Sequence, residues 1–394
     1  MICICCVCGE KVTCYYQIAF EDLIGADRNP YYQNVGLCKK CGFIFTMNPF
    51  SSLQLNNRYK NLSKFEYDSK NYILDYDYKV QAERQKNFIS ENINLSSINS
   101  MLEIGAASGY NLSIYKDCMD DLYGIEPSRN NCILAKRNYN IDMFNGMFDD
   151  YYSKKITKKY DLVFMSMVLE HIVNPMRFMK RICSIANNYI FIEIPTLDYR
   201  YREEPMGIFC EEHVNLFTLD SLNNLMNKNG FYLVNVETIH GYKRYLPAGY
   251  PAISTIWHRS SDSFSTTIFN ICSSEELLRR YIKQSNSDMK IITKKINQIP
   301  NDLKLGIWGI GHHSAMLLAN TSLKDKNIIK VYDSDSRKYS YKYNGIRIES
   351  FNIEDVNSGR VEAILITSYT AQNAIYNYIR SLNVKCEIIT LYDI

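Results

Sequence analysis

The sequence lacks a marked excess of charge, because 45 Lys and Arg residues stand against 42 Asp and Glu residues and give a formal net charge of +3. A nucleic-acid-binding protein usually carries a basic patch, or a basic run interleaved with aromatic residues, and this chain has no such run. It also lacks an apolar stretch near the ~20 residues that a helix needs to cross a bilayer. Composition therefore predicts neither a nucleic-acid partner nor a membrane span.

The chain also lacks the cysteine pattern of a secreted disulfide protein. Its 13 cysteines are an odd number, and several of them, such as Cys118, Cys132 and Cys183, stand alone within expected helices or strands. The first eight residues carry cysteines and no basic flank, which is unlike a signal peptide. We therefore expect a cytoplasmic protein.

Two Cys-x-x-Cys-Gly sequences stand near the N-terminus, at Cys5-Cys6-Val7-Cys8-Gly9 and Cys38-Lys39-Lys40-Cys41-Gly42. Four thiolates on two such turns suit a tetrahedral Zn²⁺ and leave no position for water, so we expect Cys5, Cys8, Cys38 and Cys41 to hold a structural zinc ion. The 29 residues between the pairs imply an inserted loop. Two alternatives stay open: Cys3 and Cys6 form another possible first pair, and the cysteines can instead make a redox dithiol.

Residues 101–127 have the layout of a nucleoside-binding βαβ unit. An apolar strand leads into Glu103-Ile-Gly-Ala-Ala-Ser-Gly109, a helical stretch follows, and a second strand ends at Gly124-Ile-Glu126-Pro127. Glu126 comes 21 residues after Gly105, where a carboxylate can accept hydrogen bonds from ribose hydroxyls. A dinucleotide site needs a further glycine where Ala107 stands, so the pattern favours S-adenosylmethionine, which has no phosphate.

Strand and helix patterns then alternate, which predicts a parallel, doubly wound α/β sheet of seven strands. We expect the strands near residues 101–104, 122–126, 142–144, 160–166, 187–195, 231–237 and 252–257, with helices over 72–93 and 219–229. Ligands bind at the carboxyl ends of such strands. The residues expected to bind the donor there are Glu103, Gly105, Ala106, Gly109, Glu126, Pro127, Gly146, Met147 and Met167.

Further polar sequences follow the later strands: Val168-Leu-Glu-His171, Glu193-Ile-Pro195, and Glu211-Glu-His213 before Phe217-Thr218. In this order, with the cysteine pairs and the glycine turn, the chain resembles the sugar C-methyltransferases of deoxysugar biosynthesis over nearly its whole length. The resemblance implies a zinc-binding domain (1–55), a class I S-adenosylmethionine-dependent methyltransferase domain (56–265, with a helical lead-in over 56–98) and a Rossmann-like substrate-binding domain (266–394).

The resemblance also implies methylation of a nucleotide-linked sugar. His213 matches the family's catalytic histidine and is expected to act as the base, Glu212 matches the acid beside it, and His171 matches a second active-site histidine. Tyr67 matches, more loosely, a tyrosine that reaches the substrate. A structural role is the alternative for either histidine.

Two positions depart from the family. The family's tyrosine and its first histidine fall on Cys210 and Glu211 of this sequence. In C-methylating enzymes these residues help to hold a 4-keto sugar and its enolate. Both carbon methylation and methylation of a sugar hydroxyl therefore stay open.

The C-terminal part shows a second Rossmann-like pattern after a helical connector over 273–299. A strand leads into Gly309-Ile-Gly311-His312-His313, and the next strand ends at Asp333. Without a third glycine this is a weak dinucleotide signal, and the resemblance implies a domain that closes over the substrate. The two histidines can contact a diphosphate or lie in a solvated loop.

Two other functions stay open. One is a zinc-ribbon RNA-modifying methyltransferase or RNA-binding module, against which the near-neutral charge argues. The other is a non-catalytic scaffold, against which the intact glycine turn and Glu126 argue. The sequence fixes neither the sugar nor the oligomeric state, monomer or dimer.

Overall fold

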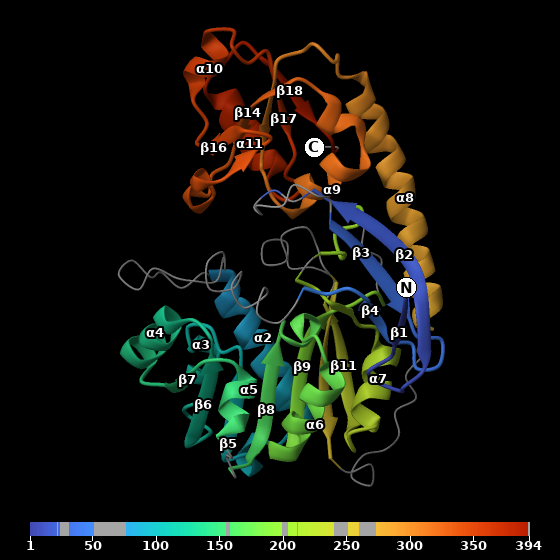
Figure 1. Ribbon diagram of the computed structural model, residues 1–394. Helices are drawn as coiled ribbons and strands as arrows, with labels where there is room; N and C mark the ends of the chain where they lie inside the picture. The colour runs from blue at the N-terminus through green and yellow to red at the C-terminus, as the bar shows by residue number, and fades with distance from the viewer. Residues whose placement is uncertain are drawn as a thin grey trace. The chain divides into compact units, whose positions relative to one another are not determined.

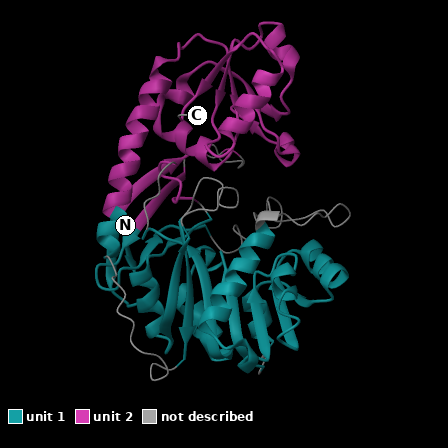
Figure 2. Ribbon diagram, turned by 180° about the vertical axis from the view of Figure 1, so that it is seen from behind, with its two compact units in different colours: residues 1–14, 36–201, 211–278 teal, residues 15–35, 202–210, 279–394 magenta. Residues whose placement is uncertain are grey.

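The computed structural model describes residues 1–21, 23, 31–50, 76–154, 158–198, 204–210, 212–239, 251–259 and 273–392. The chain divides into two compact units (Figure 2): residues 1–14, 36–201 and 211–278 form the first, and residues 15–35, 202–210 and 279–394 form the second. Among the described helices, none combines the length and apolar character that a membrane crossing requires. The predicted domain boundaries at residues 55 and 265 stay predictions.

The first unit contains a seven-stranded sheet in the order β11-β12-β9-β8-β5-β6-β7 (Figure 1). Its strands are β5 (Ser100–Ile104), β6 (Asp121–Glu126), β7 (Asp142–Asn145), β8 (Tyr160–Ser166), β9 (Ala186–Pro195), β11 (Tyr232–Ile239) and β12 (Ala252–His258). All seven predicted strands are confirmed. The prediction that they run parallel is wrong for β12, which is antiparallel to both β9 and β11. Strands β11 and β12 follow each other along the chain and are neighbours in the sheet, an arrangement that suits antiparallel pairing.

Helices cover both faces of this sheet. Leu162 and Phe164 of β8 pack in the core that includes residues of α2 (Tyr76–Asn92), α3 (Tyr110–Ser113) and α4 (Arg129–Tyr139). Val163 and Met165 point to the opposite face, which is covered by α5 (Phe148–Ser153), α6 (Pro175–Ile185) and α7 (Leu219–Asn227). A strand buried on both sides is continuously apolar, as the sequence of β8 predicts. The predicted helix over 219–229 corresponds to α7, whereas residues 72–75 of the predicted helix over 72–93 lie outside the described part.

The N-terminal residues form a second sheet, in the order β1-β2-β3-β4-β10, that the sequence interpretation missed. Its strands are β1 (Ile2–Ile4), β2 (Lys11–Phe20), β3 (Tyr31–Leu37), β4 (Ile44–Thr46) and β10 (Asn215–Leu216). Strand β10 pairs with β4, with Asn215 opposite Phe45. Because His213 lies two residues before β10, the segment that carries this histidine is anchored next to the second cysteine pair.

The second unit contains a six-stranded sheet in the order β15-β16-β14-β13-β17-β18. The strands are β13 (Leu305–Trp308), β14 (Ile328–Tyr332), β15 (Lys342–Tyr343), β16 (Ile346–Glu349), β17 (Ala363–Ile366) and β18 (Glu387–Thr390), all parallel except β15. Its helices are α9 (His312–Asn320), α10 (Ile353–Asn357) and α11 (Gln372–Ser381), and the long α8 (Ser274–Gln298) matches the predicted connector. Short 3₁₀ helices are η1 (Leu95–Ser97) and η2 (Leu169–His171) in the first unit, and η3 (Ser322–Asp325) and η4 (Ser336–Ser340) in the second.

Candidate functional site

The glycine turn after β5 is held in a conformation that few residues can adopt. Gly105 and Gly109 have φ angles of +74° and +79°, and Ala107 between them has a φ of +44°. A Cβ atom on Gly105 would lie 2.9 Å from Cγ2 of Val168. Left-handed backbone at a residue other than glycine costs energy and is concentrated at functional sites. The backbone of this turn can therefore be approached closely by a ligand. The turn also packs against Val168, in the segment that follows β8.

Glu126 closes this turn from the end of β6. Its buried carboxylate accepts hydrogen bonds from the backbone N–H groups of Ala107 (3.0 Å) and Ser128 (2.8 Å). Burial raises the pKa of this carboxyl, while the two backbone hydrogen bonds lower it. Gly146 donates its N–H to the backbone oxygen of Glu126 (3.0 Å), and the side chain of Asn145 donates to the backbone oxygen of Pro127 (2.9 Å). The ends of β6 and β7 therefore form one wall, with Met147 next along the chain as the N-cap of α5.

Glu103 is a second buried carboxylate, within β5. The side chain of Asn111 donates to its Oε1 (2.9 Å), and Oε2 has no hydrogen-bond partner among the described residues. Burial raises the pKa of Glu103 to about 8. A buried acid without a counter-charge suits a cationic ligand group, which would compensate for the cost of burying its charge.

Glu103 makes the stability of the ligand-free protein depend on pH. Because its pKa rises from 4.5 to about 8 on folding, the folded state keeps a proton that the unfolded state has lost. Its contribution to the free energy of unfolding is therefore complete below about pH 4.5 and is lost as the pH rises towards 8, by a few kcal/mol. In Glu103→Gln, the melting temperature should fall less over this window. Parallel pH profiles of the two proteins would contradict the assignment.

The segment after β8 forms the other wall. Met167 has a φ of +54° and donates its backbone N–H to the backbone oxygen of Glu193 (2.8 Å). The turn η2 follows, and the side chain of Asn215 donates to the backbone oxygens of Leu169 (3.2 Å) and Ile172 (2.7 Å). Asn215 thus fixes the turn that carries Glu170 and His171 to the strand that follows His213.

Glu170, His171 and His213 come together at this turn. One ligating atom from each lies within 4.8 Å of the others, and the two imidazole rings meet edge to face with centroids 5.1 Å apart. Nδ1 of His171 lies 2.9 Å from the backbone oxygen of Glu212. A carbonyl oxygen can only accept, so Nδ1 carries a proton, and in the uncharged form of the ring the lone pair is on Nε2. Nε2 lies 3.7 Å from Oε1 of Glu170, a fully buried carboxyl whose pKa is raised by burial.

The acid beside the histidines is not the one that the sequence suggested. Glu212 is exposed, and its backbone oxygen accepts hydrogen bonds from Nδ1 of His171 and from the backbone N–H of Val214. Glu170 lies in the cluster, and the sequence interpretation did not single it out. The remaining candidate, Tyr67, lies outside the described residues, as does Glu211.

Glu193 lies within β9 and has a structural role. Its carboxylate pairs with Arg84 and accepts hydrogen bonds from Gln81 (2.7 Å), Gln85 (2.8 Å) and Ser254 (2.6 Å). These donors saturate its oxygens, so it anchors α2 and β12 to the sheet.

The four cysteines predicted to bind zinc lie together. Their sulfur atoms all lie within 4.8 Å of one another, with Cys5 and Cys41 3.6 Å apart and Cys8 and Cys38 3.3 Å apart. Sulfur atoms at ~2.3 Å from one tetrahedral ion stand about 3.8 Å apart, so the four thiolates fit a zinc ion. The geometry favours Cys5 and Cys8 as the first pair, because Cys3 instead lies 3.6 Å from the backbone oxygen of Met47.

The second cysteine turn is packed tightly against α7 and α8. A Cβ atom on Gly42 would lie 2.5 Å from the hydroxyl of Ser274 and 2.6 Å from a carboxylate oxygen of Asp220. The side chain of Asn224 donates to the backbone oxygen of Cys41 (3.3 Å). A metal-bound turn at this place would thus stabilise the helix that follows His213.

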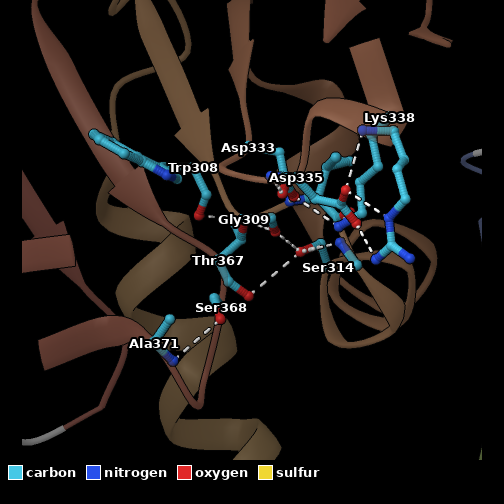
Figure 3. A network of polar contacts seen from close by, with 12 residues as sticks. Trp308, Gly309, Ser314, Asp333, Asp335, Lys338, Thr367, Ser368 and Ala371 are labelled. Carbon is cyan, nitrogen blue, oxygen red and sulfur yellow. Dashed lines mark hydrogen bonds and ion pairs between the residues drawn. The ribbon is translucent and has the colours of Figure 1, made fainter. Parts of the chain in front are cut away.

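Figure 3 shows the glycine turn of the second unit, with Asp333 and Lys338 beside it. Asp333 at the end of β14 accepts hydrogen bonds from the backbone N–H groups of Ile310 (3.0 Å) and Asp335 (2.8 Å), and it pairs with Lys338 (2.8 Å). Gly309 has a φ of +99°, and a Cβ atom there would lie 2.7 Å from Cβ of Ser368. Unlike Glu126, this carboxylate already has a lysine as its partner.

The two histidines at the start of α9 are engaged within the second unit. Nε2 of His312 lies 2.6 Å from the backbone oxygen of Phe209. His313 is buried between Glu204, whose carboxylate lies 3.1 Å from Nδ1, and the hydroxyl of Tyr392. These contacts hold the segment 204–210 against α9, so both imidazole rings have a structural role.

Gly105 provides a test of the donor turn with a matched control. Gly105→Ala should weaken binding of S-adenosylhomocysteine at least tenfold, because the added Cβ meets Val168 and displaces the turn. Gly230 has a φ of +76° and open space around its Cα, so Gly230→Ala carries the backbone strain alone and should leave binding intact. Calorimetric titration of both variants measures the difference. Equal affinities would show that the turn does not approach the ligand.

Comparison with known proteins agrees with this geometry. Residues 73–236 match the methyltransferase domain family. The matched segment contains the glycine turn, Glu126, the Glu170–His171 turn and His213. The chain thus contains a methyltransferase domain, and the enzyme class predicted from the sequence, an S-adenosylmethionine-dependent methyltransferase, is supported. No curated protein sequence matches the chain.

Solved structures resemble about half of the chain. The magnesium protoporphyrin IX methyltransferase of Synechocystis PCC 6803, with bound SAH, is 11% identical, covers 53% of this chain and 100% of its own, and has a TM-score of 0.40. The N-methyltransferase NodS of Bradyrhizobium japonicum WM9, in complex with S-adenosyl-l-homocysteine, is 11% identical, covers 52% of this chain and 96% of its own, and has a TM-score of 0.36. At these values the likeness says nothing about the acceptor.

Proposed function

We propose that this protein transfers the methyl group of S-adenosylmethionine to a nucleotide-linked sugar, as in the biosynthesis of surface polysaccharides or of sugar-bearing secondary metabolites. The observation that carries the proposal is the meeting of two walls at one edge of the sheet. The donor turn approaches Val168, and Val168 leads directly into the turn that bears Glu170 and His171. The family resemblance supplies the sugar as acceptor.

The donor side has a group for each end of S-adenosylmethionine. Glu126 stands where a carboxylate can accept hydrogen bonds from the ribose hydroxyls. Glu103, buried and without a counter-charge, suits the positively charged methionine end. Gly146 and Met147 follow β7, where the adenine would lie. Binding in this pocket would align the methyl group with the acceptor, and alignment can contribute several kcal/mol to lowering the barrier.

The reaction itself is an in-line displacement. A lone pair of the acceptor attacks the methyl carbon, the carbon–sulfur bond breaks, and its electron pair stays on sulfur to give S-adenosylhomocysteine. The acceptor also loses a proton, either from a hydroxyl or from the carbon next to a ketone. His213 and His171 stand at the turn where that proton is lost, and a neutral imidazole can accept a proton near pH 7.

The other parts of the chain have supporting roles in this proposal. Zinc on Cys5, Cys8, Cys38 and Cys41 would be structural, because four thiolates leave no open position. The second unit would bind the nucleotide of the substrate. Among the described residues no disulfide joins two cysteines. The proposed site of action is the cytoplasm.

The experiment that tests the proposal uses labelled S-adenosylmethionine. The purified protein is incubated with a panel of nucleotide-linked keto and hydroxy sugars and, separately, with total RNA, and the products are analysed by mass spectrometry. We expect a mass gain of one methylene on a sugar, with Glu126→Gln as the donor-site control. Methylated RNA, together with strong retention on heparin at low salt, would instead favour an RNA-modifying enzyme.

A further inference from the structure

The cluster of Glu170, His171 and His213 has the composition of a metal site. Two imidazoles and one carboxylate form the ligand set of many catalytic metal centres, which leave positions open for substrate. Atoms of the three side chains lie within 4.8 Å of one another. Ligands at ~2.0–2.2 Å from one ion stand about 3–4 Å apart. The 3.7 Å between Oε1 of Glu170 and Nε2 of His171 falls in that range.

The orientation of the His171 ring also indicates a metal ligand. A histidine that binds a metal usually donates its other ring N–H to a backbone carbonyl or a carboxylate, which fixes its tautomer. Nδ1 of His171 donates to the backbone oxygen of Glu212 at 2.9 Å. Nε2, the nitrogen that would bind the metal, lies 3.7 Å from Oε1 of Glu170.

Glu170 supplies a second, independent observation. The residue is 2% exposed, and its Oε2 has no hydrogen-bond partner within the described ranges. Burial of a carboxylate with an unpartnered oxygen is costly unless a cation compensates. A divalent cation would supply the missing partner.

We propose that Glu170, His171 and His213 bind a divalent transition-metal cation, such as Zn²⁺ or Mn²⁺, that coordinates oxygen atoms of the methyl acceptor. This inference rests on the proposed function. Two open positions on the ion select an acceptor with two neighbouring oxygens, as in a sugar diol or hydroxy ketone. A coordinated hydroxyl is more acidic than a free one, so it loses its proton to solvent water. The resulting oxyanion then takes the methyl group, and the sulfur keeps the electron pair. With the ion bound, His171 and His213 act as ligands, and the ion takes the place of the imidazole base named in the proposed function.

This site differs in chemistry from the cysteine cluster. Thiolates favour soft ions such as Zn²⁺, whereas a set of two imidazoles and a carboxylate also accepts Mn²⁺. A total metal count therefore separates the two sites, provided that one of them is removed by substitution.

The test is a metal count on the full chain. Wild type, Glu170→Gln and Asp121→Asn are equilibrated with excess Zn²⁺, dialysed, and measured by elemental mass spectrometry. We expect two ions per chain in wild type and in Asp121→Asn, whose exposed carboxylate pairs with Lys158 at the other end of the sheet, and one ion in Glu170→Gln. A repeat with Mn²⁺ should show one Mn²⁺ per wild-type chain and none in Glu170→Gln.

The same samples separate this inference from the proposed function. Each is titrated with S-adenosylhomocysteine to show that its donor pocket is folded, and His171→Asn replaces Glu170→Gln if the latter does not fold. One ion per chain in wild type, or equal counts in wild type and variant, would overturn the metal site. Two ions in a protein that methylates no sugar would leave the metal site standing and overturn the sugar acceptor.

Discussion

Replacing His213 with alanine should lower the turnover number by roughly 10²–10⁴ and leave the affinity for S-adenosylhomocysteine within about twofold. The imidazole lies edge to face with His171 at the proposed acceptor side, whereas the proposed donor site is formed by the glycine turn and Glu126. The loss should therefore appear in the methyl-transfer step. Single-turnover rates with labelled donor, beside calorimetric titration with S-adenosylhomocysteine, measure the two quantities separately.

A matched histidine serves as the control for this experiment. His258 ends β12 and packs on the ring of Tyr189, near the start of β9 and so away from the carboxyl ends of the parallel strands. His258→Ala should keep its turnover within about twofold of wild type. If His213→Ala also kept full turnover, His213 would have only a structural role.

Removal of zinc should have the largest effect on stability. Structural zinc contributes on the order of 10 kcal/mol to folding, and the two cysteine turns connect β1 to β2 and β3 to β4. Cys38→Ser should lose the metal and melt at a much lower temperature. Because β4 follows Cys41 and pairs with β10, we also expect turnover to fall, since the segment that carries His213 loses its anchor.

The control is another cysteine of the same region. Cys14 is exposed and lies outside the cluster, so Cys14→Ser should keep its metal and its melting temperature. Metal content, thermal unfolding by circular dichroism and turnover are measured on both variants. A metal-free Cys38→Ser that melts like wild type would show that the cysteines do not hold the fold.

The core of the fold could be predicted because its signal is local. Strands such as β8 are continuously apolar, and their spacing with helical segments indicates a doubly wound sheet. The direction of β12 could not be predicted in the same way, because an apolar sequence is compatible with a parallel or an antiparallel strand. The N-terminal sheet was missed for another reason: β10 has two residues, and it exists through its pairing with β4, far away in the sequence.

The donor site was predictable to the extent that a turn and a strand end define it. Glu126 and Gly105 lie in one βαβ unit, so their spacing in the sequence fixes their spacing in the fold. The acid of the acceptor turn was not predictable. Glu170 and Glu212 each neighbour a candidate histidine, and only the folded chain shows that Glu170 is buried beside both rings whereas Glu212 faces solvent.

The path of the chain between the two units limits where this enzyme can be truncated. The backbone passes from one unit to the other after residues 14, 35, 201, 210 and 278, so a truncation at residue 278 leaves two segments, 15–35 and 202–210, without the unit in which they pack. The second of these runs directly towards Glu212 and His213. A chain shortened at residue 278 should therefore fold poorly around His213, and expression should keep both units together.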